Sequence, residues 1–210
     1  MVTQGKKQPF MERLFLPLVK HVSYFFWDIA DIWAWKNEKM ARFYNKHIGI
    51  EYKSEYETFG LSKNSKVLHI GCGPYPLTVI ELATLLDVNV VGIDAKPKAV
   101  QEAREIITRR NMNARITIEQ GDGTTYPAQN FDVIIVSSCS YPKVAILEHL
   151  FATAKKNAII IVRELDVATR EIYESIQRHP DITIVKKMHH HSLPILLPIA
   201  WDALYLKKTS

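Results

Sequence analysis

The residues best suited to chemistry lie in a glycine turn and in an acid that follows it at a fixed distance. The run 67–78 reads Val-Leu-His-Ile-Gly-Cys-Gly-Pro-Tyr-Pro-Leu-Thr, so an apolar strand ends at Gly71 and Gly73. Glycines, which lack a Cβ atom, let the backbone turn sharply and approach a ligand closely. Asp94 ends a second apolar run, 21 residues after Gly73, where its carboxylate can accept hydrogen bonds from both hydroxyls of a ribose. This spacing predicts a nucleotide-binding βαβ unit.

The same turn argues against a dinucleotide as the ligand. Position 76, where the third glycine of a pyrophosphate-binding loop belongs, is a proline. Gripping a phosphate at a helix N-terminus requires free N–H groups, and Pro74 and Pro76 remove two of them. We therefore expect a ligand with a ribose and a base but no pyrophosphate, and S-adenosylmethionine fits that description.

The glycine turn resembles the first motif of class I S-adenosylmethionine-dependent methyltransferases, which reads acid-x-Gly-x-Gly-x-Gly. Two positions depart from it, because His69 replaces the acid and Tyr75 replaces the third glycine. The stretch Gly-x-Gly-Pro-x-Pro-Leu-Thr is also similar to nicotianamine synthases, which share the fold and cofactor but move the aminocarboxypropyl arm. The resemblance spans residues 60–208 and implies S-adenosylmethionine as the cofactor.

The resemblance implies a set of cofactor-binding positions at the ends of the first four strands. They are Gly71, Cys72, Gly73, Tyr75, Asp94, Ala95, Asp122, Gly123 and Ser138. In that family an acid at the position of Asp122 accepts a hydrogen bond from the adenine amino group. The alternative is a plain turn, because Gly-Asp-Gly is a common turn sequence. For Asp94 the alternative is a helix cap ahead of Pro97.

Catalytic and acceptor-binding candidates follow the later strands. Tyr141 comes after the fourth strand and is either an active-site residue or an aromatic cap of the next helix. Arg163 ends the fifth strand, where it binds a substrate carboxylate or forms a surface ion pair. Within His189-His190-His191, alternate side chains point to opposite faces of a strand, which disfavours a metal site. His190 is instead a candidate general base, or part of a polar strand end.

The segment before the first strand is unusually aromatic, with Tyr24, Phe25, Phe26, Trp27, Trp33 and Trp35 close together. We expect residues 1–50 to form a helical lid in which Trp27 and Trp33 contact a flat, apolar or cationic acceptor. The apolar loop 193–199 is a candidate facing wall. Core packing explains part of the aromatic content. Contact with a membrane surface is a further alternative, which Asp28 and Asp31 weaken.

The remaining pattern predicts one α/β domain over residues 51–210. Strands are expected at 67–70, 89–94, 115–119, 131–137, 158–163, 182–188 and 201–207, with helices at 77–86, 97–111, 143–154 and 167–178. Such alternation indicates a Rossmann-like parallel sheet of seven strands, and the short last connection makes the final strand antiparallel. Before it, Pro17 should begin or kink a helix. A second helix should run over 36–48 and stop at Gly49, followed over 54–61 by a connector or a short helix.

Composition sets the remaining limits. The 210 residues are 47% apolar and 23% charged, as in a folded soluble domain, and the net charge of +5 is too scattered to argue for nucleic acid. Cys72 and Cys139 form neither a disulfide framework nor a metal motif, which suits a reducing cytoplasm. The N-terminus lacks a signal-peptide pattern, and no apolar run of spanning length is present. The oligomeric state is left open.

Methyl transfer to a small organic acceptor is therefore the expected activity. Aminocarboxypropyl transfer is the first alternative, and a non-catalytic cofactor-binding module is the second, supported by the missing acid at His69. Product analysis separates the two transfers, because methyl transfer leaves S-adenosylhomocysteine and the alternative leaves methylthioadenosine.

Overall fold

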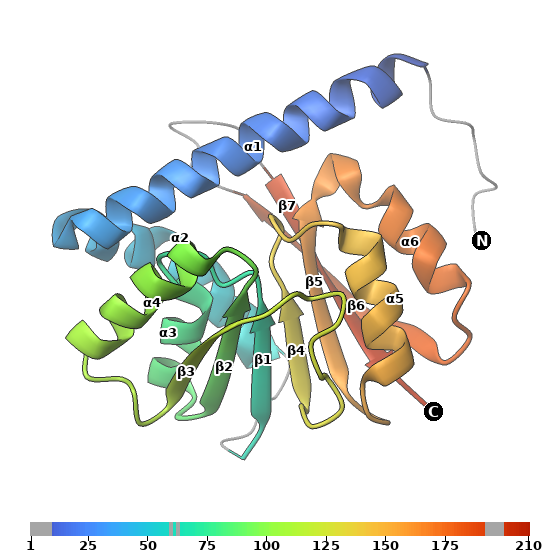
Figure 1. Cartoon of the computed structure of the whole chain (residues 1–210). Helices are drawn as coiled ribbons and strands as arrows, with labels where there is room; N and C mark the ends of the chain where they lie inside the picture. The colour runs from blue at the N-terminus through green and yellow to red at the C-terminus, as the bar shows by residue number, and fades with distance from the viewer. Residues whose placement is uncertain (1–9, 59–60, 62–63, 192–199) are drawn as a thin grey trace.

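The computed structural model describes residues 10–58, 61, 64–191 and 200–210. Its centre is a seven-stranded sheet in the order β3-β2-β1-β4-β5-β7-β6. A long helix, α1, crosses the molecule over the end of the sheet to which the parallel strands point (Figure 1). The predicted Rossmann-like sheet with N-terminal helices is therefore confirmed.

The elements alternate along the chain as expected. The strands are β1 (Lys66–Ile70), β2 (Asn89–Asp94), β3 (Ile116–Gln120), β4 (Val133–Val136), β5 (Ile159–Leu165), β6 (Ile182–His191) and β7 (Ala200–Lys208). The helices are α1 (Phe10–Lys36), α2 (Glu38–Thr58), α3 (Leu77–Leu85), α4 (Pro97–Arg109), α5 (Lys143–Thr153) and α6 (Arg170–Gln177), with a 3-10 turn, η1 (Asp166–Ala168), before α6.

The sheet is built around the parallel pairs β1·β2 and β1·β4. Because strand order reverses at β1, the carboxyl ends of β1 and β4 open a crevice where ligands bind in such folds. At the far side, β7 lies antiparallel between β5 and β6, as predicted. The final strands thus close the sheet without taking part in the crevice.

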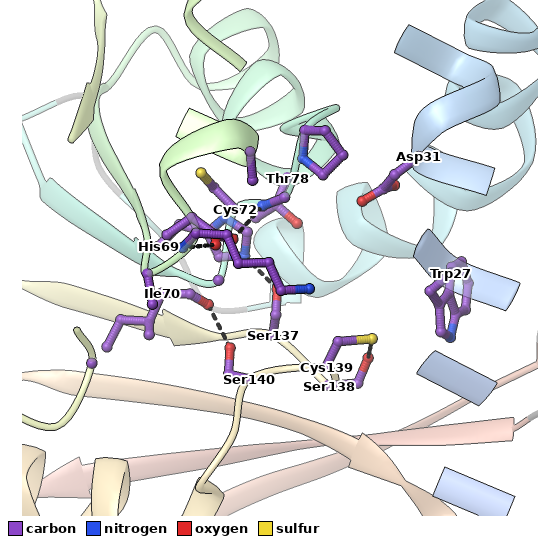
Figure 2. A pocket seen from close by; sticks show the side chains of 18 of the residues that line it. Trp27, Asp31, His69, Ile70, Cys72, Thr78, Ser137, Ser138, Cys139 and Ser140 are labelled. Carbon is purple, nitrogen blue, oxygen red and sulfur yellow. Dashed lines mark hydrogen bonds between the residues drawn. The ribbon is translucent and has the colours of Figure 1, made fainter. Parts of the chain in front are cut away.

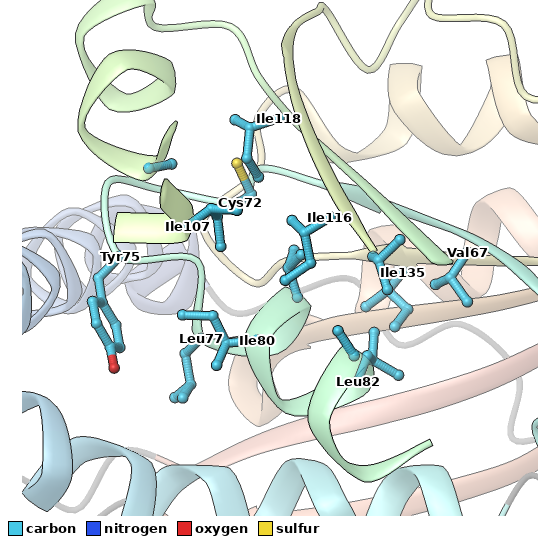
Figure 3. Close-up of a cluster of buried hydrophobic side chains, with 14 of the residues drawn as sticks. Val67, Cys72, Tyr75, Leu77, Ile80, Leu82, Ile107, Ile116, Ile118 and Ile135 are labelled. Atoms are coloured by element: carbon cyan, nitrogen blue, oxygen red, sulfur yellow. The ribbon is translucent and has the colours of Figure 1, made fainter. Parts of the chain in front are cut away.

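Apolar side chains fill both faces of the sheet, because the central strands are buried on both sides. Val67 of β1 joins the cluster under α2, α3 and α4 that Figure 3 shows, together with Ile80, Ile107 and Ile135. The next residue, Leu68, points the other way and joins the cluster under α5 and α6. This alternation is the two-residue period of a strand, and it makes the strand ends a rigid base for the site.

The N-terminal helices differ from the sequence predictions. Pro17 lies inside α1 rather than at its start, so the helix accepts the loss of one backbone hydrogen bond. The expected stop at Gly49 is wrong, because α2 continues to Thr58 and includes the first part of the expected connector, for which a short helix was one interpretation. Gly49 allows close packing, since a Cβ there would lie 3.1 Å from the Glu81 carboxyl on α3, a tight contact. Helix α2 therefore runs through the expected boundary at residue 50.

Candidate functional site

A pocket of about 380 Å³ lies at the carboxyl ends of β1, β2, β3 and β4. Its walls come from the loops after these strands and from α1 and α2. Figure 2 shows Trp27 and Asp31 of α1 on one side and His69, Cys72, Ser137 and Ser140 on the other. Its volume is within the range of small-ligand sites, and its place is the crevice that this topology creates.

The glycine loop forms the floor of the pocket and is held by β2. The amides of Gly71 and Cys72 donate to the Ile93 carbonyl at 2.8 and 3.0 Å. Gly71 and Gly73 have φ angles of +77° and +68°, which glycine adopts without strain. A Cβ at Gly71 would come within 2.3 Å of the Ser140 hydroxyl. The loop can therefore take this path only with glycine at both positions.

Asp94 organises the loop from the end of β2. One carboxylate oxygen accepts the Gly73 amide at 3.0 Å, and the other accepts the Lys96 amide at 2.9 Å. Each oxygen keeps a lone pair, so the carboxylate can still receive hydroxyl groups from a ligand. Asp122 stands further out, where the amide and hydroxyl of Thr124 both donate to it and lower the pKa of its carboxyl.

His69, which replaces the expected acid, is buried beneath the loop. Its Nε2 atom lies 2.8 Å from the Ser137 hydroxyl, and its Nδ1 atom has no hydrogen-bond partner among the described residues. Burial, reinforced by the positive charges of Arg163 and Lys143, lowers the pKa of His69 well below its usual range. The imidazole is therefore neutral, and it offers a polar but uncharged surface to the pocket.

The N-terminal helices supply the opposite wall. Trp27, Asp31, Tyr44 and Tyr52 all line the pocket. Burial raises the pKa of the Asp31 carboxyl well above its usual range, against the lowering effect of a hydrogen bond with Tyr44. Ion pairs among the described residues do not include Asp31. A carboxylate in such a place is stabilised by a cationic ligand.

Most of the residues predicted for the site meet in this pocket. They are Trp27, Gly71, Cys72, Gly73, Tyr75, Asp94, Ala95, Asp122, Gly123, Ser138 and Tyr141. Tyr75 also ties the glycine loop to α2 and α4, since its hydroxyl donates to Asn45 and accepts from Arg110. Whether each contacts cofactor or acceptor stays a prediction. Trp33, Arg163 and His190 are not in the lining, and Trp33 is 57% exposed on the outside of α1.

Arg163 is neither a surface ion pair nor available to a substrate carboxylate. Its side chain is 2% exposed, and it binds Glu55 of α2 at 2.8 Å. It also donates to the Thr78 hydroxyl at 2.7 Å and lies over the Tyr52 ring. These contacts use the guanidinium to join α2, α3 and β5, and Thr78 and Tyr52 in turn line the pocket.

His190 belongs to the same buried network rather than to the pocket. Its Nδ1 atom lies 2.7 Å from Glu51, its Nε2 atom lies 3.2 Å from Glu55, and its ring stacks on Trp201. A general base must reach the substrate, and His190 is 2% exposed beneath α2. The general-base prediction therefore has no geometric support. The loop 193–199, predicted as the facing wall, lies outside the described residues.

Sequence reasoning missed several residues of the site. Asp31 was treated as an argument against membrane contact, yet it faces the pocket one helical turn after Trp27, a spacing that could have revealed it. Lys143 was also missed. Its ammonium donates to the carbonyls of Ser137 and Arg163, and burial lowers its pKa to about 8. It fixes the loop after β4 from below.

The residues present fit S-adenosylmethionine. The floor of the pocket has no room for a side chain at Gly71 or Gly73, and the Asp94 carboxylate follows β2. The prolines after the loop lack the N–H groups that would bind a phosphate. The lining also carries carboxylates at Asp28, Asp31 and Asp94, which suit a ligand that bears a sulfonium and an ammonium group.

Comparison with known proteins agrees with this geometry. A family model described as "Methyltransferase domain" matches residues 61–195, which is more than half of the chain. Erythromycin 3''-O-methyltransferase of Saccharopolyspora erythraea is 26% identical over 114 residues. That match covers 52% of this chain and 37% of the relative, so the chain spans well under half of that protein.

Solved structures show the same fold. The E81Q mutant of MtNAS, a nicotianamine synthase, in complex with S-adenosylmethionine has a TM-score of 0.69 at 16% identity, over 95% of this chain and 76% of that chain. The [4+2]-cyclase SpnF has a TM-score of 0.63 at 13% identity, over 75% and 79%. A methyltransferase from Pyrococcus furiosus has 0.61 at 16%, over 77% and 83%. At these identities the likeness concerns the fold alone.

The described residues were also considered in the sequence analysis as parts of a membrane contact or a metal site. None of the helices in that part of the chain is long and apolar enough to cross a membrane. Within the same residues, no group of three or more histidine, cysteine and acidic side chains is arranged to hold a metal ion. His189 contacts Asp202 at 2.9 Å, whereas His190 turns to the other face of β6 and contacts Glu51.

Proposed function

The chain belongs to the methyltransferase-domain family, whose cofactor is S-adenosylmethionine, and we propose that it transfers a methyl group from this cofactor to a small organic acceptor. The single observation that carries the proposal is the pocket itself. Its floor is a glycine loop held by Asp94, and its wall is a separate helical segment that lies mostly outside the matched family region.

The division of the pocket supports distinct roles for its two sides. The loops after the strands, with Gly71, Gly73, Asp94 and Asp122, hold the cofactor. The helices α1 and α2, with Trp27 and Asp31, hold the acceptor. A carboxylate beside aromatic rings favours an acceptor that is an amine or another cation with a flat or apolar body.

When bound, the cofactor supplies a methyl group already activated on a sulfonium. Catalysis by this chain therefore consists mainly of positioning, which can supply a large part of a rate enhancement. Trp27, Tyr44 and Tyr52 exclude water from the acceptor side. Asp31 orients a cationic acceptor and can receive its proton, because burial raises the pKa of this carboxyl. His69 stays neutral and holds the Ser137 hydroxyl in place.

The test is product analysis with the purified chain and a panel of amines and other small nucleophiles. S-adenosylhomocysteine together with a methylated acceptor is the expected product pair. Calorimetry with S-adenosylmethionine and with S-adenosylhomocysteine runs in parallel. Tight cofactor binding with no turnover on any acceptor would favour the non-catalytic module, and no cofactor binding would contradict the proposal.

Aminocarboxypropyl transfer is the second candidate, favoured by one observation. The nicotianamine synthase match extends over 95% of this chain, whereas the SpnF and Pyrococcus furiosus matches extend over 75% and 77%. The N-terminal helices thus have a counterpart in that synthase, which shows likeness of fold. Release of methylthioadenosine instead of S-adenosylhomocysteine would select this reaction.

The roles of the tryptophans can be compared within one helix. Trp27→Leu should lower turnover much more than cofactor affinity, because Trp27 lines the acceptor wall. Trp33→Leu should have the smaller effect on turnover, since its side chain is 57% exposed outside the pocket. Equal losses in the two variants would contradict the assignment of the acceptor wall. We also propose a cytoplasmic location, which the free thiols Cys72 and Cys139 support.

A further inference from the structure

Helix α1 carries large apolar side chains on its outer face, in addition to Trp27, Ala34 and Trp35, which pack against the core. Of the large apolar side chains that are exposed, eight lie on α1, including Phe15, Leu18, Val22, Phe25, Ile32 and Trp33. They recur every three or four residues, so they form one continuous face along the helix. We call this face the outer stripe. Contiguous exposed apolar surface of this kind marks a site of contact.

Three charged side chains of α1 contact the rest of the protein or its pocket. Lys20 lies 3.8 Å from Glu164 on β5, Asp28 lies 3.7 Å from Lys96, and Asp31 faces the pocket. Asp31, one of the two acids that argued from the sequence against membrane contact, therefore faces away from the outer stripe, whereas Asp28 is 56% exposed and its charge is paired with Lys96. Nothing charged interrupts the stripe between Phe15 and Trp33.

Basic residues lie on both sides of the outer stripe in the sequence. Lys6, Lys7 and Arg13 precede it, and Lys36, Lys39, Arg42 and Lys46 follow it. The last four are exposed, and none of them takes part in an ion pair among the described residues. By contrast, every acid of α2 is paired: Glu38 with Arg110, Glu51 with His190, Glu55 with Arg163, and Glu57 with Lys53.

This charge distribution decides between two occupants of the stripe. A second copy of the chain, packed helix to helix in parallel, would bring the exposed Lys36, Lys39, Arg42 and Lys46 of one copy close to those of the other. A membrane that carries anionic lipids attracts these basic side chains and accepts the apolar side chains beside them. Because α1 crosses the molecule over the strand ends, it can lie flat on such a surface (Figure 1). We propose that the outer stripe docks the protein on an anionic membrane.

The test is co-sedimentation of the full chain with vesicles, with no acceptor or cofactor present. One set of vesicles is phosphatidylcholine alone, and the other contains about one third phosphatidylserine. Wild-type protein should bind the anionic vesicles, and high salt should weaken that binding. This readout is independent of methyl transfer, so its failure leaves the proposed function untouched.

A matched pair of variants isolates the stripe. Phe25→Glu changes a side chain that is 58% exposed within the stripe, and Val185→Glu changes one that is 65% exposed on β6. Both add the same charge at an exposed site, so both should fold. Phe25→Glu should reduce vesicle binding about tenfold or more, because one buried phenyl ring is lost. Val185→Glu should bind within about twofold of wild type.

A second variant tests the basic residues that follow the outer stripe. Lys39→Gln with Lys46→Gln should reduce binding to the anionic vesicles by about fivefold for each lysine and leave residual binding to phosphatidylcholine unchanged. Equal binding by Phe25→Glu and Val185→Glu, or no binding by wild type, would overturn the proposal. So would a wild-type dimer in sedimentation velocity that Phe25→Glu dissociates, since a second copy would then cover the stripe.

Discussion

Replacing Arg163 by methionine tests whether the buried network holds the acceptor wall in place. The change removes a guanidinium that is 2% exposed and leaves the Glu55 carboxylate, 0% exposed, with only His190 as a charged partner. Breaking one side of a buried pair typically costs about 3–5 kcal/mol, because the other charge stays buried. For a chain of this length the melting temperature should fall by roughly 6–20 °C.

Thermal unfolding followed by circular dichroism gives the measurement, and Arg170→Met gives the control. Arg170 also forms a 2.8 Å pair, with Glu174, but both side chains are at least 40% exposed, so the loss should stay below about 1 kcal/mol. Adding Glu55→Met to Arg163→Met should restore part of the stability, because no lone buried charge remains at that pair. Arg163→Met melting like wild type while activity disappears would refute this reasoning and return Arg163 to the substrate.

Three further predictions concern the loop and the network. Asp94→Asn should weaken S-adenosylmethionine binding by about ten- to a hundredfold in calorimetry, since a charge-assisted acceptor is lost, and unchanged affinity in a folded variant would contradict the ribose role. Gly73→Val should abolish binding and lower the melting temperature, because its φ of +68° is strained for valine and a Cβ would lie 2.6 Å from the Asp31 carboxylate; retained binding would place the ligand elsewhere. Burial disfavours the charged form of His190, but Glu55 and Glu51 outweigh it and raise the pKa of the imidazole. The stabilisation from His190 should therefore be complete below about pH 6.5 and be lost as the pH rises through the raised pKa, and a His190→Gln variant should lack that part of the pH dependence in urea unfolding.

The sheet and the cofactor loop could be predicted from the sequence because their signals are local. The apolar strands, the glycines and the acid 21 residues later lie within one βαβ unit. Arg163 and His190 carried no such signal, since Glu55 is 108 residues from Arg163 and Glu51 is 139 residues from His190. Arg163 and His190 were therefore interpreted as site residues, because the sequence does not reveal that their partners lie on a helix far away along the chain.

The sequence also failed to predict the end of α2 and the orientation of α1. Gly49 resembled a helix stop, but it lies inside α2, where its lack of a side chain lets Glu81 of α3 approach closely. Glu81 is half-buried there, and burial raises the pKa of its carboxyl. Core packing was expected to explain only part of the aromatic content of α1, and Phe25 and Trp33 are both exposed. The predicted acceptor contact of Trp33 has no support from the pocket lining, which does not include it.

The two faces of α1 have a consequence for how the protein responds to its ligands. Trp27 and Asp31 line the pocket, while Phe25 and Phe26 beside them face outward on the same rigid turns. A movement of the helix that admits or retains a ligand must also reposition the outer face. Occupancy of the pocket and contact at that face are then thermodynamically linked, and each must change the affinity of the other by the same factor. One helix is enough to make the two events reciprocal.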